Sequence, residues 1–176
     1  RRREDGLPHG DVPRLRAPRP PRLIHYSLIV QFNMKKIIGF YGRPGSGKTT
    51  TLNLLIELLG EKGQGDNPVT INYRGRKIVI TPGGDSADIV KQNIEFFEKQ
   101  EADILVTAAR NGDNTGASQF LDNHYNEASD ALLIWFGKNH STSLAKMIDV
   151  MQAKELRAFL DLLIEEWDKY PEGWSY

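Results

Sequence analysis

From residue 34 onward, the apolar positions of the chain follow two alternating periods. Short apolar runs bounded by polar or glycine-rich turns predict strands at residues 36–41, 69–73, 77–81, 103–107 and 131–136. Apolar residues spaced three and four positions apart predict helices at 49–59, from Asp85 or Ser86 onward, at 117–125 and at 154–170. The order of these elements indicates the α/β class.

Strands that alternate with helices predict a mainly parallel sheet with helices on both faces, which is a three-layer arrangement. The strands 69–73 and 77–81 are the exception, because only Arg74-Gly75-Arg76 separates them, and we predict a β-hairpin there. Ligands of parallel sheets bind beyond the carboxyl ends of the strands. We therefore expect the four segments that follow strand ends to meet around one site: 42–49, 82–85, 108–116 and 137–143.

The first of these segments carries a phosphate-binding motif. It reads Gly42-Arg43-Pro44-Gly45-Ser46-Gly47-Lys48-Thr49, which is G-x-x-x-x-G-K-[ST] between a strand and a helix. Its glycines permit backbone angles that turn amide N–H groups toward phosphates, and the helix adds the positive end of its dipole. We predict that all eight residues bind nucleotide, that Lys48 reaches the β- and γ-phosphates and Thr49 binds Mg²⁺, and that Thr50 contacts the α-phosphate.

With this motif in its strand–helix setting, residues 36–60 resemble the P-loop NTPase superfamily. The resemblance implies a three-layer P-loop fold, a nucleoside triphosphate, Mg²⁺, and cleavage or transfer at the β–γ bond. It also implies an acidic residue at the end of a neighbouring strand that holds Mg²⁺ through water. Asp85 is our candidate, although Ile80 and Thr81 occupy the strand end itself. Capping of the following helix is an alternative role for Asp85.

The other segments that follow strands indicate the bound nucleotide and the catalytic residues less strongly. The segment Ile80-Thr81-Pro82-Gly83 is similar to the D-T-P-G switch of GTPases, but isoleucine replaces the aspartate, and no N-K-x-D guanine motif is present, so ATP is favoured by elimination. Arg110 follows a predicted strand and could stabilise transferred charge, or it could be a solvent-facing loop residue. Asp113 to Thr115 could orient a water molecule or an acceptor hydroxyl. The predicted catalytic residues are thus Lys48, Asp85 and Arg110.

The amino-acid composition narrows the possible classes of protein. The chain of 176 residues has no cysteine, which excludes disulfides, a thiol nucleophile and thiolate metal sites. No apolar run is long enough to span a membrane. From Met34 onward there are sixteen Lys and Arg against twenty Asp and Glu, so this part is mildly acidic and does not indicate nucleic-acid binding. We expect a cytoplasmic protein.

Residues 1–33 differ from the rest, with seven arginines and five of the nine prolines. Such a composition predicts a disordered tail. The tail could bind nucleic acid or anionic lipid, or it could be a transit peptide, although its three acidic residues and its prolines argue against the latter. We favour a third interpretation, in which translation begins at Met34 and residues 1–33 are not native. The nucleotide-binding domain would then be residues 34–176.

Three functions are compatible with these features. The first is a Mg²⁺-dependent ATP-binding protein that hydrolyses ATP. The second is a kinase that transfers the γ-phosphate to a small molecule or nucleotide, which would need an acceptor that the sequence does not identify. The third is a nucleotide-dependent switch with slow or no hydrolysis that binds a protein partner through residues 82–88 and 110–116. Because no arginine-rich lid segment is visible, we favour hydrolysis.

Overall fold

The computed structural model describes residues 35–112, 116–126 and 131–169. The predictions made for residues 1–33 and for Asp113 to Thr115 therefore lie outside the described residues. The boundary proposed at Met34 also falls outside them and stays a prediction.

Strands and helices alternate along the described chain as the sequence predicts. In order they are β1 (Lys35–Gly42), α2 (Lys48–Leu58), β2 (Val69–Tyr73), β3 (Arg76–Thr81), α3 (Ala87–Lys99), β4 (Ile104–Arg110), α4 (Ala117–Asn126), β5 (Ala131–Gly137) and α5 (Ala145–Lys169). Two predicted bounds were wrong. Strand β4 continues to Arg110 instead of ending at Thr107, and α5 begins at Ala145 instead of Lys154.

The strands form one sheet in the order β2-β3-β4-β1-β5. Strands β3, β4, β1 and β5 are parallel, whereas β2 pairs antiparallel with β3, which confirms the predicted hairpin. Strand β1, which leads into the phosphate-binding motif, lies between β4 and β5. In this register Gly42 aligns with Arg110 and Thr81 with Thr107. The carboxyl ends of the parallel strands thus share one edge of the sheet.

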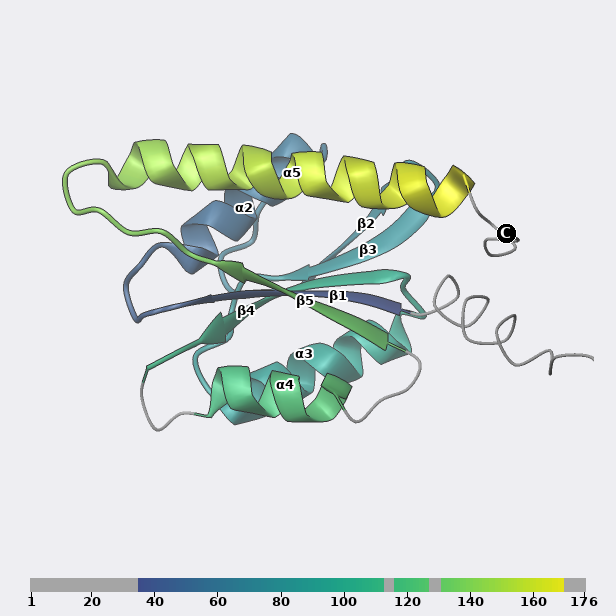
Figure 1. Cartoon of the computed structure of the whole chain (residues 1–176), viewed down its shortest axis with the longest axis horizontal. Helices are drawn as coiled ribbons and strands as arrows, with labels where there is room; N and C mark the ends of the chain where they lie inside the picture. Colours follow the sequence, from purple (N-terminus) through teal and green to yellow (C-terminus); the bar gives the residue numbers. More distant parts are fainter. Residues whose placement is uncertain (1–34, 113–115, 127–130, 170–176) are drawn as a thin grey trace, which may run out of the picture.

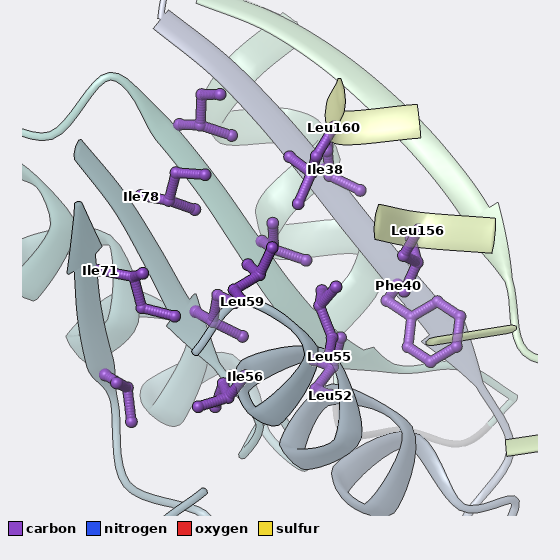
Figure 2. Packing of buried hydrophobic residues seen from close by; sticks show 14 of the residues in the cluster. Ile38, Phe40, Leu52, Leu55, Ile56, Leu59, Ile71, Ile78, Leu156 and Leu160 are labelled. Atoms are coloured by element: carbon purple, nitrogen blue, oxygen red, sulfur yellow. The ribbon is translucent and has the colours of Figure 1, made fainter. Parts of the chain in front are cut away.

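The helices cover both faces of the sheet. Helices α2 and α5 lie on one face and α3 and α4 on the other (Figure 1), which confirms the three-layer arrangement. Alternation along β1 explains the division, because Ile38 and Phe40 pack toward α2 and α5 while Ile37 packs toward α3 and α4. Figure 2 shows the first of these cores, in which Leu55 of α2 and Leu156 of α5 belong to the same cluster as β1. Each such buried side chain contributes about 1.5–3 kcal/mol.

The early start of α5 has a simple physical cause. Its first half exposes Met147 and Met151 and buries Asp149 and Gln152. The buried face there is polar, so the apolar period that predicts a helix begins only further along the chain. Among the helices that the structure describes, α5 included, none has the length and apolar character needed to cross a membrane.

Candidate nucleotide-binding site

The four segments that follow β1, β3, β4 and β5 meet at one edge of the sheet, as predicted. Four hydrogen bonds join them: Lys138 N to Tyr41 O (2.7 Å), Asn111 N to Gly42 O (3.1 Å), Arg110 N to Gly84 O (2.8 Å) and Thr49 Oγ1 to Pro82 O (3.2 Å). Three of these bonds tie neighbouring strand ends together, and the bond from Thr49 to Pro82 spans from the start of α2 to the end of β3, past β4. The segment 42–49 takes part in three of them directly or through Tyr41, so it lies at the centre of the site.

The backbone of the motif has the shape that its glycines predict. Gly45 and Gly47 both adopt left-handed conformations, with φ of 67° and 93°. Gly47 is also the N-cap of α2, and no side chain caps this end of the helix. The first N–H groups of a helix have no acceptor within the helix. The amino end of α2 therefore offers donors to an anion at the place where the sequence predicts a phosphate.

Lys48 places its ammonium group against the same bend. The side chain is buried, and its Nζ donates to the carbonyl oxygens of Gly42 and Arg43, both at 3.0 Å. The hydroxyl of Ser46 is buried beside it and has no hydrogen-bond partner among the residues that the structure describes. A buried cation and an unsatisfied hydroxyl suit a polyanionic ligand, because the phosphates of a nucleotide would supply an opposite charge for the ammonium group and an acceptor for the hydroxyl.

The outer side of the motif suits a magnesium ion. Thr49 Oγ1 lies 3.1 Å from Asp66 Oδ1 and 3.2 Å from the oxygen of Pro82. Within the described ranges, no three His, Asp or Glu side chains gather into a preformed metal site. Mg²⁺ does not need one, because it keeps several waters and is bound through one or two carboxylates plus the phosphates of the substrate. The Thr49 hydroxyl with one nearby carboxylate matches that requirement.

Asp66 was missed at the sequence level. It lies between α2 and β2, in a polar stretch with no motif and no period. A weak signal was available in the three glycines of this stretch, Gly60, Gly63 and Gly65, which allow tight backbone turns. Nothing in the spacing, however, indicates that the stretch returns to Thr49.

Asp85 is not the N-cap of α3. Ser86 caps α3 instead, accepting a hydrogen bond from Ile89 N at 3.3 Å, so the capping role considered for Asp85 is filled by its neighbour. The Asp85 side chain is exposed, and it makes no hydrogen bond or ion pair with the described part of the chain. Its predicted role in binding Mg²⁺ stays a prediction.

The other predicted residues lie around the same edge. Arg110 is the last residue of β4 and not a loop residue, and it sits next to Gly42 in the register of the sheet. Thr50 is exposed in the first turn of α2, and Arg43 and Pro44 are exposed in the bend. The structure thus gathers these positions, while their individual contacts to a nucleotide stay predictions.

A second polar cluster supports the motif from behind, and no pattern in the sequence predicts it. Asp149 of α5 is buried, forms an ion pair with Lys138 at 3.0 Å and accepts a hydrogen bond from Thr51 Oγ1 at 3.2 Å. A Cβ atom at Gly47 would lie only 2.7 Å from Asp149 Oδ1. The carboxylate therefore packs directly against the bend, and it links α5 and the end of β5 to the phosphate-binding motif.

A cavity of about 710 Å³ opens beside the motif. Its walls include residues of the bend, Asn111 and Gly112 after β4, and Lys138 and His140 after β5. Cavities of this size commonly hold small ligands. A neighbouring cavity of about 510 Å³ reaches Trp135 and α4, and both are lined by Tyr41 and Asn111.

Comparison with known families agrees with this geometry. Residues 27–161 match the family described as ABC transporter, whose members are P-loop NTPases. The matched range includes the whole sheet, the phosphate-binding motif and most of α5. No curated protein and no solved structure matches the chain.

Proposed function

The chain belongs to the ABC transporter family of P-loop NTPases, and from that premise we propose that it binds ATP with Mg²⁺ and hydrolyses it to ADP and phosphate. Water supplies the oxygen that replaces the bridging oxygen on the γ-phosphorus, and a proton is released. The observation that carries the proposal is the buried ammonium group of Lys48 inside a bend of left-handed glycines.

The chain's own groups would act mainly by binding and by holding charge in place. Lys48 exchanges its two carbonyl partners for phosphate oxygens, since charge-assisted bonds to phosphate are stronger than bonds to neutral carbonyls. The uncapped amino end of α2 donates its amides to the phosphates. Bound Mg²⁺ supplies neutralisation of the charge on the β- and γ-phosphate oxygens. Arg110, beside Gly42 in the sheet, would add positive charge near the transferred group.

Hydrolysis is favoured over the two alternatives because no described feature identifies an acceptor or a partner. The kinase would need a bound acceptor close to the motif, and the switch would need a partner surface that changes with the γ-phosphate. Both stay predictions, and the same assay separates them from hydrolysis.

The test uses the full chain with Mg²⁺ and ATP, with and without a panel of nucleosides, nucleotides and sugars. We expect ADP and phosphate in equal amounts without any acceptor. ADP with a phosphorylated acceptor and no free phosphate would support the kinase instead. Tight binding of ATP without turnover would support the switch.

Lys48→Ala tests the assigned residue. One charge-assisted hydrogen bond contributes about 1.5–3 kcal/mol, so we expect ATP affinity, measured by calorimetry, to fall about 10- to 150-fold. Lys91→Ala, which removes an exposed lysine of α3, is the matched control and should leave the affinity unchanged. Unaltered ATP affinity in a folded Lys48→Ala variant would contradict the assigned site.

A further inference from the structure

Asp66 lies where a metal-binding carboxylate is needed. Its Oδ1 is 3.1 Å from Thr49 Oγ1, the hydroxyl that the P-loop motif directs to Mg²⁺. Ligand oxygens at right angles on an octahedral Mg²⁺, each about 2.0–2.1 Å from the ion, are about 2.9 Å apart. The observed separation is therefore close to one edge of such an octahedron. It also suits a carboxylate that accepts a hydrogen bond from a water on the ion.

The surroundings of the Thr49 hydroxyl are consistent with this role. A hydroxyl oxygen that binds a cation must turn its proton away from the ion and toward an acceptor. Two acceptors are present at Thr49, the Asp66 carboxylate and the Pro82 carbonyl. Either one can take the proton, which leaves the lone pairs of the oxygen for the metal.

Contacts with α2 hold Asp66 in its position. Asn53, one turn after Thr49 on α2, donates to the oxygens of both Thr49 and Gly65 at 2.8 Å. The residue before Asp66 is thus tied to the helix that presents Thr49. A Cβ atom at Gly63 would lie 2.4 Å from Asn53 Oδ1, so glycine is needed for this close approach.

A second element holds Asp66 from the other side. A Cβ atom at Gly83, in the segment after β3, would lie 3.1 Å from the backbone oxygen of Asp66 and 3.2 Å from the Cβ of Asp66. The oxygen of Gly83 in turn accepts a hydrogen bond at 2.7 Å from the side chain of Asn93 on α3. Asp66 is therefore packed against the end of β3, which is the strand end where the P-loop superfamily has its acidic residue.

The charge of Asp66 and the side chains at the strand end complete the case. Asp66 is exposed and, within the described ranges, no lysine or arginine forms an ion pair with it. At the end of β3 the buried Thr81 hydroxyl stands without a hydrogen-bond partner in the described part of the chain. Threonine cannot supply the negative charge that the strand-end acid supplies elsewhere in the superfamily, whereas Asp66 brings one from the neighbouring segment.

Building on the proposed function, we infer that Asp66 is the acidic residue that holds Mg²⁺ beside Thr49, and that it replaces an acid at the end of β3. This assignment differs from the sequence-based choice of Asp85. Asp85 follows the same strand, but its side chain makes no hydrogen bond or ion pair with Thr49 or with any other residue that the structure describes.

The experiment measures ATP affinity by calorimetry in Mg²⁺ and in EDTA, so that the metal dependence is read without turnover. Four proteins are compared: the full chain, Asp66→Asn, Asp85→Asn as the variant of the rival candidate, and Glu95→Gln, which removes an exposed carboxylate of α3, as the matched control. All three substituted residues are exposed, so the variants should keep the thermal midpoint of the wild type. Binding of Mn²⁺ with ADP, followed by electron paramagnetic resonance, gives an independent measure of the metal.

We expect Mg²⁺ to strengthen ATP binding by the wild type and by the control Glu95→Gln. Loss of a residue that supports a metal commonly lowers metal affinity about 10- to 100-fold, and we expect Asp66→Asn to lose its Mg²⁺ enhancement and its Mn²⁺ signal to that degree. Its affinity for ATP in EDTA should not fall, because a negative charge near the phosphates is removed.

Several results would overturn the assignment while leaving ATP binding intact. One is a full Mg²⁺ enhancement in Asp66→Asn, particularly if Asp85→Asn loses it. Others are equal losses of affinity in Mg²⁺ and in EDTA, which would mark Asp66 as a structural residue, and the absence of any Mg²⁺ enhancement in the wild type. Failure of the wild type to bind ATP under either condition would instead contradict the proposed function.

Discussion

Gly47 is the position where the structure allows a substitution to be predicted most closely. Alanine at Gly47 meets two separate obstacles. The residue has φ of 93°, in the left-handed region, where a side chain costs about 1–2 kcal/mol. The new Cβ would also lie 2.7 Å from Oδ1 and 3.2 Å from Oδ2 of Asp149, which is closer than van der Waals contact.

Gly45 provides a control that separates these two costs. It also has a left-handed backbone, with φ of 67°, but no atom lies within 4 Å of the position of its Cβ. Gly45→Ala should therefore carry the backbone cost alone. Gly47→Ala should carry in addition the cost of overpacking, about 1–3 kcal/mol, because Asp149 is buried and held by Lys138 and cannot move away easily.

The assay is equilibrium unfolding in urea. With a slope of about 2 kcal/mol/M, an extra loss of about 2 kcal/mol places the midpoint of Gly47→Ala about 1 M below that of Gly45→Ala. The same substitution should cost less in an Asp149→Ala background, where the obstructing carboxylate is gone, so the two changes should be coupled. Equal midpoints for the two glycine variants, or additive effects with Asp149→Ala, would refute the reasoning.

Two further substitutions test the packing of the sheet. Gly39→Ala should destabilise the protein by about 1–3 kcal/mol, because its Cβ would lie 2.4 Å from the ring of Trp135, and the loss in thermal denaturation should shrink when Trp135→Leu makes room. Burial lowers the pKa of Lys36 below 10.5, so at pH values below that lowered pKa the charged lysine costs the folded protein stability, and this cost disappears as the lysine loses its proton. The free energy of unfolding of Lys36→Met relative to the wild type should therefore decrease as the pH rises from the folded pKa toward 10.5, and a difference that is constant with pH would contradict this.

The strand and helix order was predictable because its signals are local. Buried runs in β1 and β3, the glycines of the motif and the hairpin turn are each determined by residues close together in the sequence. Parallel strands joined by helices then leave few topologies. The motif 42–49 was equally predictable from the sequence, since its shape depends on backbone conformations that favour glycine.

What the sequence could not show depends on contacts between distant segments. Asp149 lies on the buried face of α5 because it pairs with Lys138, and a polar buried face hides the start of the helix from any search for apolar periodicity. Strand β4 was predicted too short because the alanines that precede Arg110 are poor strand formers, although both are fully buried. Asp66 lies at the site because Asn53 of α2 ties the preceding Gly65 to the helix and because Asp66 packs against Gly83, and both residues belong to other segments of the chain.

The central claim, that the bend 42–49 and Lys48 bind the triphosphate, is tested most directly by a crystal structure with Mg²⁺ and a non-hydrolysable ATP analogue. We predict that Nζ of Lys48 leaves the oxygens of Gly42 and Arg43 and lies within hydrogen-bond distance of the β- and γ-phosphates, with the amides at the start of α2 directed at the same groups. An analogue bound elsewhere, or a Lys48 that keeps both carbonyl partners while the analogue is bound, would contradict the account.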